Sequence, residues 1–153
     1  MHSRIFQVST EPIKQTDYID ECNYYDHWFT NSIADYVNGN TSRTDDIEWL
    51  KLCSRGYAID SDESGEYLIV KSKENYFQNA YNRFKELLDV VKDCTLQDFS
   101  KEIYEMWELK NQYEEKFGFY ADFDGDLMTL DSFVRQCKEN TKYYIGGTID
   151  YHC

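Results

Sequence analysis

Three aspartates between residues 122 and 126 have the alternating spacing of a cation-binding loop. Asp122, Asp124 and Asp126 match the first three ligand positions of an EF-hand calcium loop. That loop needs glycine at its sixth position and a bidentate acid at its twelfth, where this chain has Leu127 and Phe133. The spacing therefore predicts a solvated turn, and we expect neither calcium nor zinc to bind there with structural affinity.

A second group of carboxylates falls on a predicted helix over residues 95–117. At about 100° per residue, Asp98, Glu102 and Glu105 fall on one side of this helix, with Glu108 and Glu115 beside them. A solvated helix face is the commoner meaning of such a pattern. The sharper hypothesis is a partner-binding surface, made of Asp98, Glu102, Glu105, Glu108, Glu115, Asp122, Asp124 and Asp126.

The chain is strongly acidic, and its charge restricts the class of partner. It has 29 Asp and Glu against 16 Lys and Arg, a formal net charge of −13 on 153 residues. Aromatic residues make up 17% and hydrophobic residues 41%, which excludes a disordered acidic tail. So negative a field repels nucleic acid and anionic membranes and attracts basic surfaces. We therefore expect a protein partner with a basic surface, such as a nucleic-acid-binding protein, and no direct binding to nucleic acid or membrane.

Motifs of the common catalytic and nucleotide-binding sites are missing. The sequence has no Gly-x-Gly-x-x-Gly, no phosphate-binding Gly-Lys-Ser/Thr loop and no Gly-x-Ser-x-Gly elbow. His27 near Cys22, and His152 beside Cys153, lack the paired spacing of a zinc site. Five widely spaced cysteines and an N-terminus without a signal peptide are typical of a cytoplasmic protein with reduced thiols. We expect no cofactor and assign no catalytic residue.

The elements that position these side chains follow from hydrophobic period and capping residues. Two long helices are predicted, one over Lys73–Lys92 with an apolar stripe, and one over residues 95–117 that begins at a capping box of Thr95 and Asp98. Two or three shorter helices are predicted, over Asp45–Ser54, from Leu130 to Cys137 and in part of residues 16–37. Predicted strands are 4–8, 57–60, 66–71, 119–123 and 143–151.

These elements predict a single α+β domain over residues 1–153. We expect a small antiparallel or mixed sheet of four to five strands, with the helices packed mainly on one face. The two long helices are expected to build the core through their aromatic faces, with Phe84 buried on the first. On the second, the predicted buried face is Phe99, Ile103, Met106, Tyr113 and Phe117.

Two functional hypotheses of different classes follow. The first is a non-enzymatic protein-binding module, in its most concrete form an inhibitor that presents carboxylates in place of nucleic-acid phosphates. Small acidic proteins that block restriction or CRISPR nucleases are similar to this chain in size and charge alone. The alternative is a small cytosolic enzyme with an acidic, divalent-metal site near Asp122, Asp124 and Asp126. A large pocket with several buried carboxylates would favour the enzyme, and a convex acidic face would favour the binder.

Overall fold

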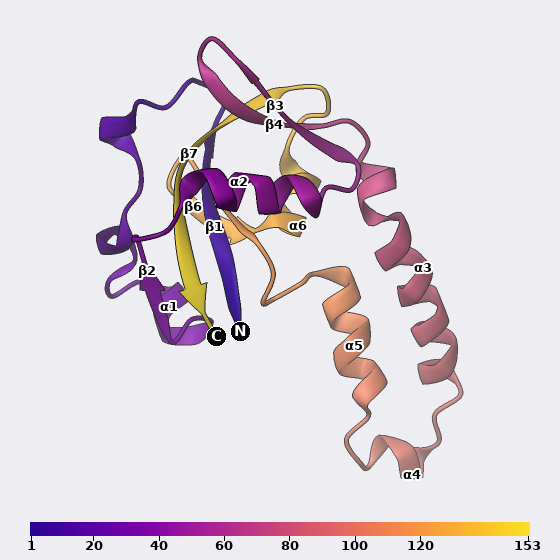
Figure 1. The fold of residues 1–153 in the computed structure, drawn as a ribbon. Helices are drawn as coiled ribbons and strands as arrows, with labels where there is room; N and C mark the ends of the chain where they lie inside the picture. The colour runs from indigo at the N-terminus through magenta and orange to yellow at the C-terminus, as the bar shows by residue number, and fades with distance from the viewer.

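The computed structural model describes residues 1–153 as an α+β fold with one mixed sheet of seven strands (Figure 1). The strand order is β3-β4-β7-β1-β5-β6, and β2 also pairs with β7. Only the pair of β1 and β5 is parallel. The strands are β1 (His2–Ser9), β2 (Tyr36–Asn38), β3 (Tyr57–Asp62), β4 (Gly65–Val70), β5 (Tyr120–Phe123), β6 (Asp126–Thr129) and β7 (Lys142–His152).

Six α-helices and two short 3-10 turns connect the strands. None of the helices is long and apolar enough to cross a membrane. They are η1 (Gln15–Asp17), η2 (Glu21–Tyr24), α1 (Trp28–Ser32), α2 (Arg43–Leu52), α3 (Lys73–Lys92), α4 (Leu96–Phe99), α5 (Tyr104–Tyr113) and α6 (Leu130–Gln136).

The two central strands contain the two ends of the chain. β1 and β7 run antiparallel from His2 opposite His152 to Ser9 opposite Tyr144, so the termini lie side by side (Figure 1). Because side chains alternate along a strand, β1 sends Phe6 and Val8 to one face and Ile5 to the other. The first face packs against α2, α6 and the start of α3, and the second packs against η2 and α1.

The outer edge of β7 is paired in two places with a gap between them. β4 pairs with residues 142–144 and β2 pairs with residues 150–152. In the gap, Arg43 donates from Nε to the carbonyl oxygen of Gly146 and from its second terminal nitrogen to that of Ile145, each at 2.7 Å. The same guanidinium pairs with Glu66 at 2.9 Å. Arg43 therefore satisfies carbonyl groups that a neighbouring strand would otherwise bind.

A buried carboxylate fixes α2 to the sheet. Asp46 accepts hydrogen bonds from Arg4 Nε at 2.5 Å and from the hydroxyl groups of Thr41 and Thr148, each at 2.7 Å. Arg4 also pairs with Asp150. Both partners of the Asp46–Arg4 pair are largely buried, so removing either one would destabilise the fold by leaving the other charge without its partner.

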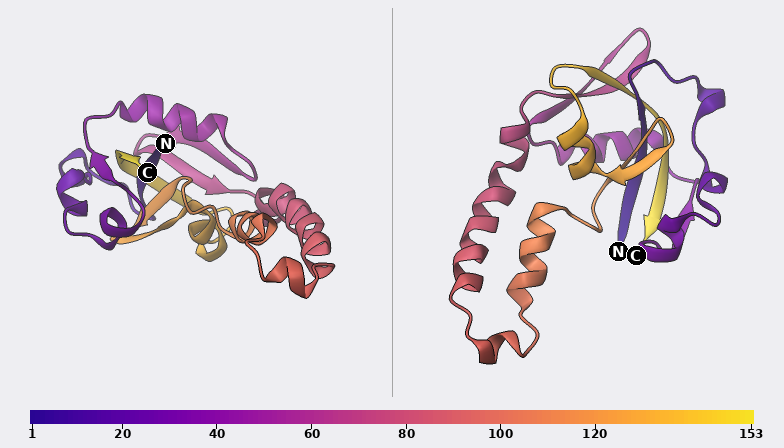
Figure 2. Two further views of the ribbon diagram at one scale, coloured as in Figure 1. Left: turned by 90° about the horizontal axis from the view of Figure 1, so that it is seen from below. Right: turned by 180° about the vertical axis from the view of Figure 1, so that it is seen from behind.

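Residues 73–117 form a helical arm that projects from the sheet. α3 and α5 run antiparallel and lie side by side, and α4 lies at the tip (Figures 1 and 2). The only buried residues of α3 are Tyr76 at the root of the arm and Leu87, and α4 and α5 have none. The arm is therefore a thin two-helix layer and not the centre of the core.

Comparison with the sequence predictions confirms the α+β class and corrects several details. The sheet has seven strands, not four to five, because the short strands β2 and β6 were missed. The expected helix over residues 95–117 is two helices separated by residues 100–103, where the Ser100 hydroxyl donates to the Gln97 carbonyl and competes with helix continuation. Residues 16–37 form only η1, η2, the five-residue α1 and part of β2.

Candidate protein-binding surface

The exposed residues of α5 are mostly apolar, whereas its half-buried residues are mostly polar. The half-buried side chains of α5 are mostly polar and include Glu105, Glu108 and Gln112. Its five exposed residues are Tyr104, Met106, Trp107, Lys110 and Tyr113. A surface helix normally buries its apolar stripe and leaves the polar side in water. The reversed order leaves Tyr104, Met106 and Trp107 exposed to solvent, whereas Tyr113 lies against the Arg135 guanidinium, 4.1 Å from its ring centroid.

The neighbouring helix α3 has an apolar stripe that α5 covers only in part. At about 100° per residue, Leu87 lies at one edge of the stripe, while Tyr81 and Leu88 lie at the other. Leu87 is 2% exposed, whereas Tyr81 and Leu88 are exposed. At the tip, Leu96 is 85% exposed.

Exposed apolar side chains are concentrated on this arm. Of the fourteen large hydrophobic residues that are exposed in the protein, nine lie between residues 81 and 113. Single exposed apolar residues are ordinary, but so many on one projecting element are unusual. These residues lie on more than one side of the arm, because Tyr81 and Val90 are nine positions apart in α3 and therefore about 180° apart around the helix. We use the name arm surface for the whole set, defined as Tyr81, Leu88, Val90, Leu96, Phe99, Tyr104, Met106, Trp107 and Tyr113.

The predicted carboxylate face of residues 95–117 does not form as one surface. Asp98 closes the capping box on α4 by accepting from the backbone and the hydroxyl of Thr95. Glu102 lies in the break between α4 and α5 and is exposed. Glu105 is half-buried, and Glu108 is paired with Arg83 of α3 at 2.9 Å. Glu108 therefore holds the two helices of the arm together.

The loop aspartates also separate into different roles. Asp122 is buried, and its two oxygens accept from the Tyr24 hydroxyl at 2.7 Å and from the Gly125 backbone at 3.0 Å. Asp124 occupies a turn with a positive φ of 51°, and Asp126 begins β6. No group of three or more His, Cys, Asp or Glu side chains is arranged to hold a metal ion. The metal-site alternative therefore has no geometric support at these residues.

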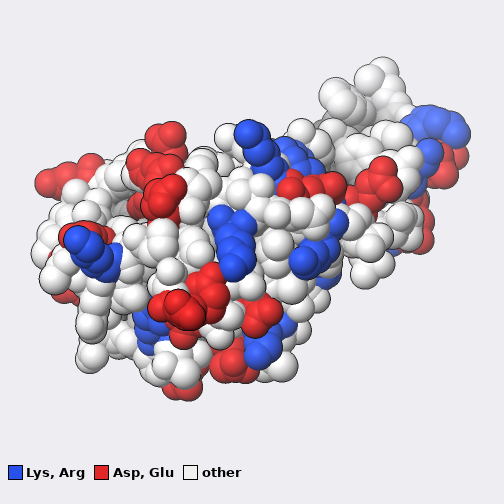
Figure 3. All heavy atoms as spheres, turned by 90° about the horizontal axis from the view of Figure 1, so that it is seen from above, with Lys and Arg blue, Asp and Glu red and all other residues white.

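The exposed loop aspartates belong to a flank of the sheet that lacks basic residues. Residues 15–42 contain five acids and residues 117–134 contain four, and neither stretch has a Lys or Arg. The bond between Tyr24 and Asp122 joins the two stretches, which we call the acidic flank. On the face seen from above, by contrast, red and blue side chains lie next to each other (Figure 3). The excess negative charge is therefore distributed unevenly.

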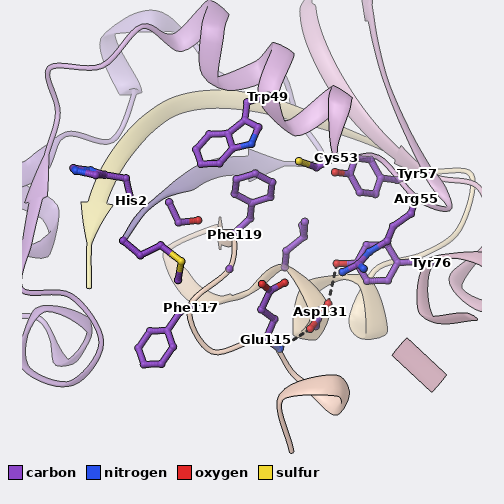
Figure 4. A pocket seen from close by; sticks show the side chains of 14 residues that line it. His2, Trp49, Cys53, Arg55, Tyr57, Tyr76, Glu115, Phe117, Phe119 and Asp131 are labelled. Carbon is purple, nitrogen blue, oxygen red and sulfur yellow. Dashed lines mark hydrogen bonds between the residues drawn. The ribbon is translucent and has the colours of Figure 1, made fainter. Parts of the chain in front are cut away.

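Glu115 lies at the mouth of a pocket between the arm and the sheet. The pocket has a volume of about 350 Å³ and is lined by residues of α2, β1, the root of α3 and the segment before β5. Figure 4 shows the Glu115 carboxylate pointing into it, beneath Trp49 and Phe119. The only buried acid in its lining is Asp131, which accepts from the Tyr76 hydroxyl at 2.9 Å and from the Glu115 backbone at 2.7 Å.

Sequence reasoning missed the arm surface because it placed the same residues in the core. Phe99, Met106 and Tyr113 are exposed, and Ile103 and Phe117 are only half-buried. Phe84, expected in the core, is also half-buried. A signal was present, since the apolar residues of 104–113 share that segment with Glu105, Glu108 and Gln112 and leave no clean polar side.

Comparison with known proteins adds no functional assignment. No protein-family model, curated protein or solved structure matched this chain. The features of this chain that bear on its function are the arm surface, the acidic flank and the pocket.

Proposed function

We propose that this protein is a non-enzymatic binding module whose arm surface docks on an apolar patch of a basic protein. The observation that carries this proposal is the exposure of Tyr104, Met106 and Trp107 on α5. Aromatic residues and methionine are enriched in protein interfaces, and tryptophan and tyrosine dominate the binding energy of many. The arm presents these residues on a projecting element that a partner can reach from several sides.

The charge of the chain selects the partner. The arm carries ten acids and seven bases, a formal charge of −3, while the rest of the chain carries nineteen acids and nine bases, a charge of −10. A basic partner is attracted over long range by the whole molecule, and the apolar arm then provides the close contact. A second copy of this chain would bring −13 against −13, so self-association through the arm is opposed by charge.

The experiment compares two triple variants that leave the net charge unchanged. The arm variant carries Tyr104→Ser, Met106→Ser and Trp107→Ser. The control variant carries Tyr25→Ser, Trp28→Ser and Tyr36→Ser, which are equally exposed aromatic positions on the other side of the sheet. Partners are captured from host lysate with the wild type, purified, and then measured for association and dissociation rates, with circular dichroism to confirm folding.

The expected partner is basic, and its association rate falls as salt rises. The arm variant should dissociate at least about tenfold faster, a loss of about 1.4 kcal/mol, while the control variant stays within about twofold of the wild type. Equal dissociation from the arm variant would overturn the proposal. So would arm-dependent dimerisation of this chain in the absence of any partner, measured by sedimentation.

A second function, inhibition by charge mimicry of nucleic acid, is favoured by the acidic flank. A base-free surface is suited to a groove that binds phosphates through Lys and Arg. The variant Asp17→Lys, Asp35→Lys and Asp126→Lys changes exposed positions of this flank. If mimicry is the function, this variant loses binding and nucleic acid competes with the wild type for the partner, whereas the arm variant binds normally.

A further inference from the structure

The pocket beside Glu115 combines aromatic walls with a carboxylate that has no partner. Its walls include Trp49, Tyr57, Phe119 and Leu130, and its volume of about 350 Å³ falls within the range of small-ligand sites. Trp49 and Phe119 pack edge to face with ring centroids 5.0 Å apart, so this wall is fixed. Figure 4 shows both rings above the Glu115 carboxylate.

The carboxylate of Glu115 makes no hydrogen bond and no ion pair, although its backbone is held by Asp131. Two cationic groups also line the pocket, and neither is within ion-pair distance of Glu115. Arg55 lies over the Tyr76 ring, 5.2 Å from its centroid, and the Met1 ammonium donates to the Cys153 carbonyl oxygen at 2.5 Å. Desolvation in the cleft, and secondarily the charge of Asp131, raise the pKa of Glu115. The site therefore has a negative charge that an incoming cation would stabilise.

Gly118 leaves room for this carboxylate. A Cβ at Gly118 would stand 2.7 Å from the carboxyl carbon of Glu115. The absence of a side chain at residue 118 lets the Glu115 side chain fold back over the chain and into the pocket. The rest of Gly118 is held in place, since its carbonyl oxygen accepts from the Tyr151 hydroxyl at 2.5 Å.

We propose that this pocket binds an organic cation, with Glu115 as the counter-ion and the Trp49–Phe119 wall around the attached alkyl chain. Aromatic rings beside a carboxylate are a recurrent arrangement for ammonium and guanidinium groups, because the ring faces and the acid both attract positive charge. The cation is either a free amine or a lysine or arginine side chain of the basic partner. The second source rests on the proposed function, whereas the first does not.

The test uses small probes and the isolated full-length protein. Two-dimensional NMR follows the Trp49 indole and the Glu115 amide during titration with n-butylammonium, n-butanol or butyrate. Butylammonium should shift both signals in a saturable way, and butanol and butyrate should bind at least about tenfold more weakly. If butyrate binds more tightly than butylammonium, the pocket is an anion site formed by Arg55. If butanol binds as tightly as butylammonium, the pocket is an apolar cavity without charge preference. Either result overturns the proposal.

Three variants separate a built site from general attraction to an acidic protein. Glu115→Gln should weaken butylammonium binding about tenfold, while Glu102→Gln, the same change on a residue of the arm that does not line the pocket, should not alter it. Gly118→Ala keeps the net charge but displaces the Glu115 carboxylate, and it should weaken binding to a similar degree. Unchanged affinity in Glu115→Gln, with the fold intact by NMR, would contradict the proposal.

The source of the cation is settled by a peptide. Acetyl-Gly-Lys-Gly-amide that binds as tightly as butylammonium supports a protein side chain, and binding of butylammonium alone supports a free amine. Both outcomes keep the organic cation as the ligand class. Because these measurements contain no partner protein, a lack of butylammonium binding would contradict only the pocket proposal. Normal partner binding by the arm variant would contradict only the arm proposal.

Discussion

The same chemical change at two leucines of the arm should lower stability by very different amounts. Leu87, a residue of α3, is 2% exposed, whereas Leu96 is 85% exposed at the tip. Replacement by alanine removes three carbons in each case, worth about 0.8 kcal/mol each when fully buried. Leu87→Ala therefore loses about 2.4 kcal/mol of transfer free energy plus a cavity contribution, about 3 kcal/mol in total. Leu96→Ala loses only about 0.4 kcal/mol, because little of its surface is covered.

The measurement is equilibrium unfolding in urea, followed by far-ultraviolet circular dichroism. The helical signal reports the arm, and an unchanged m-value shows that the unfolding transition itself has not changed. An equal cost at the two positions would mean that Leu96 is covered in solution. A cost below about 1 kcal/mol at Leu87 would mean that α3 and α5 do not pack. Either result would refute the two-layer description of the arm, on which the exposure of α5 depends.

Further predictions concern the sheet. Asp46→Asn should destabilise the protein by about 3 kcal/mol in urea unfolding, because it leaves the largely buried Arg4 guanidinium short of one counter-charge. Arg43→Met should cost about 2 kcal/mol in the same assay, because two β7 carbonyl groups lose a charged donor. Burial raises the pKa of five tyrosines, so the folded state keeps protons that the unfolded chain releases above a pH of about 10. The free energy of unfolding should therefore fall as pH rises above that value, by up to about 1.4 kcal/mol per pH unit for each tyrosine. Absorbance at 295 nm should show these tyrosines ionising only when the protein unfolds. They are Tyr24, Tyr57, Tyr76, Tyr120 and Tyr151.

Elements with strong local signals could be predicted from the sequence. The apolar stripe over 20 residues predicts α3 with its observed bounds. The hairpin of β3 and β4 is predicted by Gly65, which has a positive φ in the turn. The Thr129 cap fixed the start of α6, where its hydroxyl accepts from the Ser132 backbone. These features depend on residues within a few positions of each other.

Features that depend on distant contacts could not be predicted. β2 and β6 have three and four residues, too few for a period, and they are strands only because β7 and β5 lie beside them. The apolar residues of α5 can be seen in the sequence, but the side of α5 that packs against α3 is decided by tertiary contacts. The same holds for Glu115, whose position at a pocket depends on Asp131 holding its backbone.

The most direct test of the central proposal is a hydrogen-exchange footprint of the partner complex. If the arm surface is the docking site, amides of α5 and of the C-terminal half of α3 should exchange more slowly in the complex than in the free protein. The sheet and the acidic flank should exchange as before. Slowed exchange confined to residues 15–42 and 117–134, with α5 unchanged, would contradict docking through the arm and place the partner on the acidic flank instead.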